Sequence, residues 1–285
     1  MNIIKKIFKE LDNQNIKYST DYKERKETKF FLSKGVNELG YIEPAKYPKN
    51  LIKNFVLKVN KYHLIKVVKI IKGLGFKFYR FSKRLTYFYF DMNFGLLRLD
   101  LIVSKVSKIS FKKSKGKFVC FVGPEGGGKT STLSAVYTIL ENFPVERKLM
   151  NFSSFKKSKI WRIYDLINKI FLIKFNKERL ILSDRYLYLT FRKNLFFKKI
   201  IRFIAPEPDI VFIMKADYKT LKKRRGPICS DKKNVENMYG LFEEAKNKII
   251  INTNKSLNKN IKLIIDKILA LYIGNEDEKL IRKLI

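Results

Sequence analysis

Histidine and cysteine are almost absent from this sequence. Its 285 residues include one histidine, His63, and two cysteines, Cys120 and Cys229. A single histidine excludes histidine-rich metal sites and leaves little room for a Ser-His-Asp hydrolase, and two cysteines imply no disulfide framework. Any metal chemistry is therefore expected to use oxygen ligands. Cys120, which lies in a hydrophobic run, is expected to be a buried thiol rather than a redox group.

Long uncharged stretches are also missing. No apolar run approaches the roughly 18 to 20 residues that a membrane span needs, and lysine interrupts the most hydrophobic pieces, such as "IFLIKF". The first residues, "MNIIKKIFKELDNQ", become charged too early for a secretory signal. We therefore expect no membrane span and a cytoplasmic protein.

Acidic residues are scarce: 26 stand against 62 basic residues, for a formal net charge of +36. Such a charge suggests a polyanionic partner. However, only 13 of the basic residues are arginines, and the lysines are dispersed among Ile, Asn and Phe, as an A/T-rich coding sequence would give. Nucleic-acid interfaces favour clustered arginine with aromatic partners. We therefore expect no specific nucleic-acid partner, and only non-specific, salt-sensitive binding.

Glycine and proline are few as well, at 13 and 7 residues, whereas 24 Phe and 15 Tyr supply material for a core. The length suits two modest domains. A polar, lysine-rich stretch over residues 104 to 117 separates two hydrophobic runs and marks the boundary. We predict a smaller α+β domain over residues 1–108 and an α/β domain over residues 116–285.

Residues 116–285 alternate between strand and helix patterns. Hydrophobic strands are predicted over 117–123, 179–184, 209–216 and 248–253, and helices over 129–143, 161–175, 235–247 and 256–272. Asp217 and Ser256 are predicted caps of the helices that follow them. This alternation predicts a parallel sheet flanked by helices. In the first domain the pattern predicts a helix over 64–76, stopped by Gly73, a strand over 76–81, and a hairpin of strands over 84–92 and 95–103.

Four of the 13 glycines fall within the six positions 123–128, in "CFVGPEGGGKTST". The segment matches G-x-x-x-x-G-K-[ST] between a strand and a helix, the pattern of a phosphate-binding P-loop. Backbone N–H groups and the helix N-terminus would hold the phosphates of ATP, Lys129 would reach the β and γ phosphates, and Thr130 would help hold Mg²⁺. The predicted nucleotide-binding residues are Gly123, Pro124, Glu125, Gly126, Gly127, Gly128, Lys129, Thr130 and Ser131.

A P-loop enzyme also needs a carboxylate near the metal. The strand "LILSD" ends in Asp184, which we predict to act with Thr130 at the magnesium ion. A simple helix-capping role for Asp184 is the alternative.

From about Gly116 to Tyr272 the chain resembles the thymidylate-kinase-like nucleoside monophosphate kinases. The resemblance rests on the loop "FVGPEGGGKTSTL", which includes Glu125, on "LSDRY", on "PEPDIVFIMKADYKTLKKRRG" and on "IIINTNKSLNKNIKLIIDKIL". It implies that Arg185 handles the acceptor phosphate and that a basic lid containing Arg224 and Arg225 neutralises transition-state charge. The family's arginine-rich acceptor segment is represented only by "PVERKLMNF" with Arg147, and residues that contact the nucleobase have no match.

The basic residues of that lid have a plainer interpretation. Lys222, Lys223, Arg224 and Arg225 are also compatible with an ordinary charged surface, and the run Lys232–Lys233 fits a solvated helix. For Arg185 the alternative is a salt bridge to a nearby acid such as Glu178, which would only brace the strand.

The first domain faintly resembles a nucleotidyltransferase-like domain. Where that family carries paired metal-binding aspartates, this chain has Asn54 and Val56, and only Asp100 remains as a third carboxylate. Two-metal chemistry needs the full cluster. We therefore expect a degenerate domain with a structural or acceptor-side role.

The hypothesis from sequence is an ATP- and Mg²⁺-dependent kinase acting on a small phosphate-bearing acceptor, most simply a nucleoside monophosphate. Its catalytic residues are Lys129, Arg185, Arg224 and Arg225. Two alternatives stay open: a kinase for another small molecule, such as a sugar or a lipid-linked intermediate, and a basic nucleic-acid-associated ATPase. The sequence also leaves a homodimer open.

Overall fold

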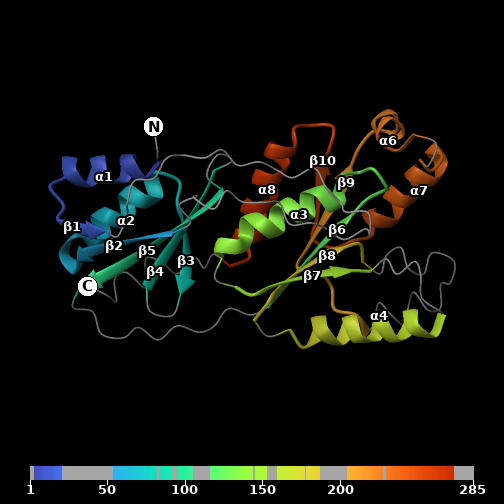
Figure 1. Ribbon diagram of the computed structural model, residues 1–285, viewed down its shortest axis with the longest axis horizontal. Coiled ribbons are helices and arrows are strands. Elements are labelled where there is room, and N and C mark those ends of the chain that lie inside the picture. The colour runs from blue at the N-terminus through green and yellow to red at the C-terminus, as the bar shows by residue number, and fades with distance from the viewer. Residues whose placement is uncertain are drawn as a thin grey trace.

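The computed structural model contains two five-stranded sheets, each with its own helices (Figure 1). It describes residues 3–20, 54–81, 84–91, 95–104, 116–143, 145–152, 159–176, 178–186, 204–226 and 229–272. Most of the expected boundary between the domains, residues 105–115, lies outside this part of the chain.

The first sheet has the strand order β1-β2-β5-β4-β3. β2 and β5 pair in parallel, and the other neighbours pair antiparallel, including the predicted hairpin of β4 and β5. The bounds are α1 Ile3–Asn13, β1 Tyr18–Thr20, β2 Asn54–Asn60, η1 Lys61–His63, α2 Leu64–Gly73, β3 Lys77–Phe81, β4 Arg84–Asp91 and β5 Gly95–Ser104. The mixed α+β pattern and the helix end at Gly73 agree with the sequence prediction.

Helices α1 and α2 cover one face of this sheet because each carries an apolar stripe at helical spacing. In α1 the buried residues are Ile3, Ile4, Ile7 and Leu11, and in α2 they are Leu64, Val67, Val68, Ile70 and Ile71. Both stripes join one buried cluster with alternate residues of the strands. The lysines of the two helices are consequently left on the outer face.

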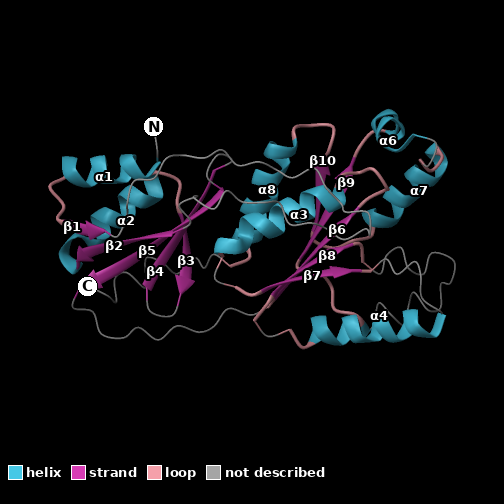
Figure 2. Cartoon of the chain, viewed as in Figure 1, coloured by secondary structure: helices cyan, strands magenta, loops and turns pink. Residues whose placement is uncertain are grey.

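The second sheet is parallel, with the order β10-β9-β6-β8-β7 (Figure 2). The bounds are β6 Lys117–Val122, α3 Lys129–Ile139, η2 Leu140–Asn142, β7 Arg147–Asn151, α4 Lys159–Lys174, β8 Leu180–Asp184, β9 Ile210–Lys215, α6 Tyr218–Arg225, α7 Lys232–Glu243, β10 Lys248–Asn252 and α8 Leu257–Ala270. The predicted α/β class is confirmed. β7 was missed because "RKLMN" has too few apolar residues to predict a buried strand.

The central strand β6 is buried on both faces. Val119 and Phe121 pack into the cluster that contains α3 and α8, whereas Phe118, Cys120 and Val122 pack into the cluster that contains α4. Cys120 is a buried thiol, as predicted, and its burial raises its pKa. A strand fully enclosed by helices explains the continuous apolar run in the sequence.

The helix caps also follow the prediction. Asp217 accepts a hydrogen bond from the Thr220 N–H at 2.6 Å and caps α6, and Ser256 accepts one from the Lys259 N–H at 3.3 Å and caps α8. The predicted helix of residues 235–247 begins earlier, at Lys232, because Asp231 caps it. Within the described residues, no helix is long and apolar enough to cross a membrane.

The two sheets are joined through a shared apolar cluster. Phe88, Phe90 and Leu96 of the first sheet pack into the cluster of α3 and α8, with the Phe88 and Phe143 ring centroids 5.2 Å apart. A salt bridge of 2.7 Å joins Lys77 of β3 to Asp266 of α8. The first sheet therefore contacts α8, the helix whose other end borders the pocket described below.

We predict that Phe88→Ala lowers the free energy of unfolding by about 3 to 5 kcal/mol, because it opens a cavity between the two sheets. The measurement is urea denaturation followed by circular dichroism. Phe171→Ala is the matched control, since that side chain is 53% exposed, against 2% for Phe88. An equal loss in both variants would contradict the assigned role of Phe88.

Candidate active site

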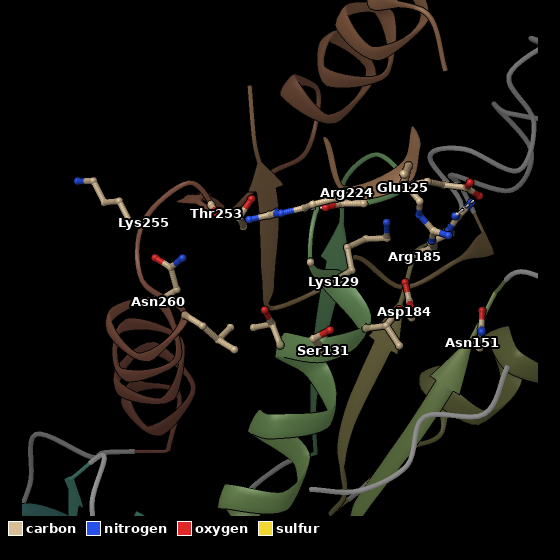
Figure 3. A pocket seen from close by; sticks show the side chains of 16 residues that line it. Glu125, Lys129, Ser131, Asn151, Asp184, Arg185, Arg224, Thr253, Lys255 and Asn260 are labelled. Atoms are coloured by element: carbon tan, nitrogen blue, oxygen red, sulfur yellow. Dashed lines mark hydrogen bonds and ion pairs between the residues drawn. The ribbon is translucent and has the colours of Figure 1, made fainter. Parts of the chain in front are cut away.

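A pocket of about 530 Å³ lies at the carboxyl edge of the parallel sheet, where β6 turns into α3 (Figure 3). Parallel sheets present their ligands at this edge. The pocket is lined by Glu125, Gly126, Gly128, Lys129, Thr130, Ser131, Thr132, Asn151, Asp184, Arg185, Arg224, Arg225, Thr253, Lys255, Leu257 and Asn260. It therefore combines residues of the glycine-rich loop with Asp184 and Arg185.

Glycines are required in the loop for two different reasons. At Gly123, whose φ is +151°, a Cβ atom would lie 2.6 Å from the carbonyl oxygen of Met214. At Gly126, whose φ is +77°, a Cβ atom would lie 2.9 Å from Cγ of Arg225. The first glycine lets the loop pass over β9, and the second permits the left-handed turn beside α6.

Lys129 is almost completely buried at the start of α3. Its Nζ donates a hydrogen bond of 2.7 Å to the carbonyl oxygen of Pro124. Burial lowers its pKa to about 8; the Asp184 carboxylate opposes this shift and the Arg185 guanidinium adds to it. Lys129 is thus a partly desolvated cation whose charge an anionic ligand would stabilise.

Thr130 and Asp184 form the second part of the site. The Thr130 hydroxyl donates a hydrogen bond of 2.9 Å to Oδ2 of Asp184, and Oδ1 of Asp184 is buried with no hydrogen-bond partner. A hydroxyl beside an unsatisfied carboxylate oxygen suits Mg²⁺, which binds oxygen and usually keeps several waters. The residues present therefore fit the predicted ion. No cluster of three or more His, Cys, Asp or Glu side chains with metal-binding geometry occurs among the described residues.

Arg185 has an unusual backbone conformation for a non-glycine residue. Its φ is +66°, and its N–H donates to the carbonyl oxygen of Phe121 at 2.8 Å. A left-handed residue of this kind costs of order 1 kcal/mol or more and persists only where the surroundings hold it. Its Nη2 donates to Oε1 of Glu125 at 3.2 Å.

The partner of Arg185 differs from the one named in the salt-bridge alternative. The acid paired with it is Glu125 of the loop, not Glu178. Glu125 also places a negative charge beside Arg185, which offsets the repulsion between its guanidinium and the Lys129 ammonium. No local sequence pattern indicates this pair, because its residues are 60 positions apart.

The predicted lid is the C-terminal end of helix α6. Arg224 donates from Nη1 to the Gly126 carbonyl at 3.1 Å and from Nη2 to the Thr253 carbonyl at 2.9 Å, and it extends across the pocket above Lys129 (Figure 3). Arg225 also lines the pocket, whereas Lys222 and Lys223 do not. Lys232 and Lys233 lie in α7 and are exposed, as expected for a solvated helix.

Some predicted loop residues shape the turn without lining the pocket, namely Gly123, Pro124 and Gly127. The pocket lining also includes six residues that the sequence pattern did not predict: Thr132, Asn151, Thr253, Lys255, Leu257 and Asn260. Asn151 lies at the end of β7, where it pairs in register with Asp184, and it was not found because β7 itself was not predicted. Thr132 has a buried hydroxyl with no hydrogen-bond partner, a feature that no sequence pattern reveals.

In the first sheet, the Asp100 carboxylate is bound by side chains of the same sheet. Asp100 accepts hydrogen bonds from Arg98 at 2.9 and 2.8 Å and from the Thr86 hydroxyl at 2.8 Å. In the parallel pairing of β2 and β5, Val56 stands opposite Asp100 and Asn54 opposite Arg98. The Asp100 carboxylate is thus engaged by its own sheet. The degenerate nucleotidyltransferase interpretation remains a prediction.

No protein-family model matches this sequence, and no curated protein matches it in sequence. Among solved structures, the chain is similar to a deoxyadenosine kinase from M. mycoides with the products dCMP and a flexible dCDP bound, at 18% identity and a TM-score of 0.35, over 54% of this chain and 99% of that one. It is also similar to APE1195, at 15% identity and a TM-score of 0.37, over 55% of this chain and 96% of that one. At these scores the likenesses assign neither a substrate nor an activity to this chain.

Titration of Lys129 should be visible in ligand binding. Below pH 8 its ammonium is protonated and attracts phosphate, and above pH 8 the free protein loses that charge. We therefore predict that the affinity for a non-hydrolysable ATP analogue is constant between pH 7 and 7.5 and weakens several-fold by pH 9.5. The measurement is isothermal titration calorimetry across this range.

The control for this titration is a second lysine of the same pocket. Lys129→Met should bind weakly with little dependence on pH, whereas Lys255→Met, at an exposed lining residue, should keep the wild-type profile. A wild-type affinity that is flat through pH 9.5 would contradict the low pKa of Lys129.

Proposed function

We propose that this protein is an ATP-dependent, Mg²⁺-requiring phosphotransferase that moves the γ-phosphate of ATP to a small phosphate-bearing acceptor, most simply a nucleoside monophosphate. The observation that carries the proposal is the convergence of three groups in one pocket. These groups are the buried Lys129 of the loop, the Thr130–Asp184 pair and the Arg185–Glu125 pair. In this proposal the first group binds the donor phosphates, the second binds the metal ion, and the third binds the anionic acceptor.

On the donor side, the loop amides and Lys129 would bind the β and γ phosphates of ATP. Lys129 now donates to the Pro124 carbonyl, so its ammonium would exchange that neutral acceptor for a phosphate oxygen. Both hydrogen bonds have a charged donor, but a phosphate oxygen also carries negative charge, and the attraction between opposite charges is stronger in a desolvated site than in water. The exchange therefore favours the bound state.

Thr130 and Asp184 would hold the magnesium ion, Thr130 through its hydroxyl and Asp184 directly or through a bound water. The ion would supply charge neutralisation for the donor phosphates. The contribution of the protein is orientation: the hydrogen bond between the two side chains fixes the Asp184 carboxylate, and burial shields its free oxygen from bulk water.

On the acceptor side, the guanidinium of Arg185 would bind the acceptor phosphate. A guanidinium has five N–H donors in a planar fork, so Arg185 can contact a phosphate while keeping one donor on Glu125. The Arg185 side chain is 23% exposed and that of Glu125 is 44% exposed, so a ligand can reach the pair from the pocket. Glu125 thereby orients the arginine.

Reaction at a phosphate acceptor needs no general base, because the attacking oxygen is already ionised. The described carboxylates of the pocket are Asp184 and Glu125. Asp184 is bound to Thr130, and Glu125 is bound to Arg185. At the end of β7, Asn151 contributes a neutral amide that cannot accept a proton from a hydroxyl. This distribution favours a phosphate acceptor over a hydroxyl acceptor.

The two arginines of α6 would neutralise charge on the transferred group. Arg224 bridges the Gly126 and Thr253 carbonyls across the pocket, and Arg225 lies beside the loop. A loose phosphoryl-transfer transition state spreads charge over its equatorial oxygens, where additional cations stabilise it.

A hydroxyl acceptor, such as a sugar, is the second candidate, and Glu125 is the observation that favours it. If the acceptor displaced Arg185 from Glu125, the freed carboxylate could accept a hydroxyl proton. In that case Glu125→Gln would abolish turnover. In the preferred mechanism the same variant only loosens the orientation of Arg185.

The decisive experiment measures ADP release from ATP and Mg²⁺ with nucleoside monophosphates, nucleosides and no acceptor. Thymidylate is the first acceptor to test, since the sequence motifs resemble those of its kinases. We predict release that depends on a monophosphate. Release with nucleosides alone would favour the hydroxyl candidate, and release that requires only nucleic acid would favour the ATPase interpretation.

Arg185→Ala should raise the KM for the acceptor or lower kcat by roughly tenfold or more, because it removes a charge-assisted hydrogen bond worth about 1.5 to 3 kcal/mol. The affinity for the ATP analogue should barely change. Arg179→Ala is the matched control, since Arg179 precedes the same strand at its opposite end and pairs with Glu146. Equal loss of ATP binding and acceptor use in Arg185→Ala would contradict the acceptor role.

A further inference from the structure

The outer face of helices α1 and α2 carries charge that the proposed reaction does not use. On α2 the exposed residues are Ile65, Lys66, Lys69, Lys72 and Gly73, and Tyr62 immediately before the helix is 76% exposed. Their spacing places them along one stripe. We call five of these residues, Tyr62, Ile65, Lys66, Lys69 and Lys72, the α2 stripe.

The neighbouring helix extends this basic surface. On α1 the lysines Lys5, Lys6 and Lys9 are exposed, and α1 packs beside α2 on the same face of the first sheet (Figure 1). The exposed acids of α1 are Glu10 and Asp12. Lys66 and Lys69 form no ion pair with any described residue. The surface of the helix pair therefore has a positive excess.

The sequence around α2 contains no acid at all. Between Pro44 and Phe90 there is no Asp or Glu, whereas Lys and Arg occur throughout. Acid-free stretches also occur over residues 101–124 and 185–206, but each is only about half as long. The longest run without an acid therefore contains α2.

An anionic membrane is a poor partner for this face. A helix that binds at a membrane surface inserts its apolar side among the lipids. The apolar sides of α1 and α2 are already buried against the first sheet, in residues such as Ile7, Val67 and Ile71. Of the large apolar side chains on the two helices and the turn before α2, those of Tyr62 and Ile65 are exposed. The helices therefore cannot insert without unfolding the domain.

The same features fit a single-stranded nucleic acid. Lysine ammonium groups bind phosphates as point charges without reading sequence, and an exposed tyrosine ring offers a surface on which a base stacks. Lys66, Lys69 and Lys72 follow one side of the helix over about 9 Å. We propose that the α2 stripe, flanked by the lysines of α1, binds single-stranded nucleic acid through its phosphates, with Tyr62 stacking on one base. This contact is sequence-independent and separate from the pocket.

The test measures the affinity of the full chain for a labelled oligothymidylate of about 20 nucleotides by fluorescence anisotropy, at NaCl concentrations between about 50 and 200 mM. Lys66→Glu/Lys69→Glu should weaken binding at least tenfold at 100 mM salt. It should also reduce the slope of log affinity against log salt by about 1.4, since each lost phosphate contact removes about 0.7 for a single strand.

The matched control is Lys259→Glu/Lys262→Glu. These two lysines are also exposed and three residues apart on a helix, α8, so the variant changes the net charge equally. It should weaken binding less than threefold. Equal losses in both double variants would overturn the proposal, because binding would then reflect only the net charge of +36.

A second pair of variants tests the stacking contact. Tyr62→Ala should weaken oligothymidylate binding about tenfold, and Tyr62→Phe should restore it, because stacking needs the ring and not the hydroxyl. Thermal unfolding should be unchanged in every variant. The proposal is also overturned if the protein does not bind the oligonucleotide but binds vesicles of phosphatidylserine and phosphatidylcholine in a way that Lys66→Glu/Lys69→Glu abolishes.

Discussion

The hydrogen bond between Thr130 and Asp184 is the contact on which the site depends, because it joins the two neighbouring strands that supply its chemistry. β6 and β8 pair in parallel, so the loop after one and the aspartate after the other meet at the same edge of the sheet. The loop places Lys129 and Glu125 near this bond. Arg185, which directly follows Asp184, has a left-handed backbone conformation, and its side chain pairs with Glu125. The donor and acceptor halves of the proposed reaction therefore share one rigid support.

Charge explains why this site suits phosphate. The described lining residues include five cations, Lys129, Arg185, Arg224, Arg225 and Lys255, and two carboxylates, Glu125 and Asp184. The other cations surround Lys129, whose ammonium is partly desolvated by burial. Mutual repulsion among such groups is relieved when polyphosphate binds, so part of the binding energy comes from the arrangement of the unliganded protein.

Much of this arrangement could be predicted from sequence, because its signals are local. The glycine spacing indicated the loop, the apolar run before Asp184 indicated a strand end, and Asp217 and Ser256 indicated the starts of helices. β7 could not be predicted, since its sequence "RKLMN" gains its burial only from neighbours distant in the chain. The Arg185–Glu125 pair and the free hydroxyl of Thr132 depend on side-chain geometry across elements, which no single-sequence pattern encodes.

The most direct test of the central claim follows the transferred phosphate itself by ³¹P NMR, with ATP, Mg²⁺ and thymidylate or another monophosphate. The account predicts that the monophosphate signal is replaced by the paired signals of a new diphosphate, at a rate that Lys129→Ala lowers by at least roughly 10², the scale of losing a transition-state charge stabiliser. Inorganic phosphate as the sole product, or an unchanged rate in a folded Lys129→Ala variant, would contradict it.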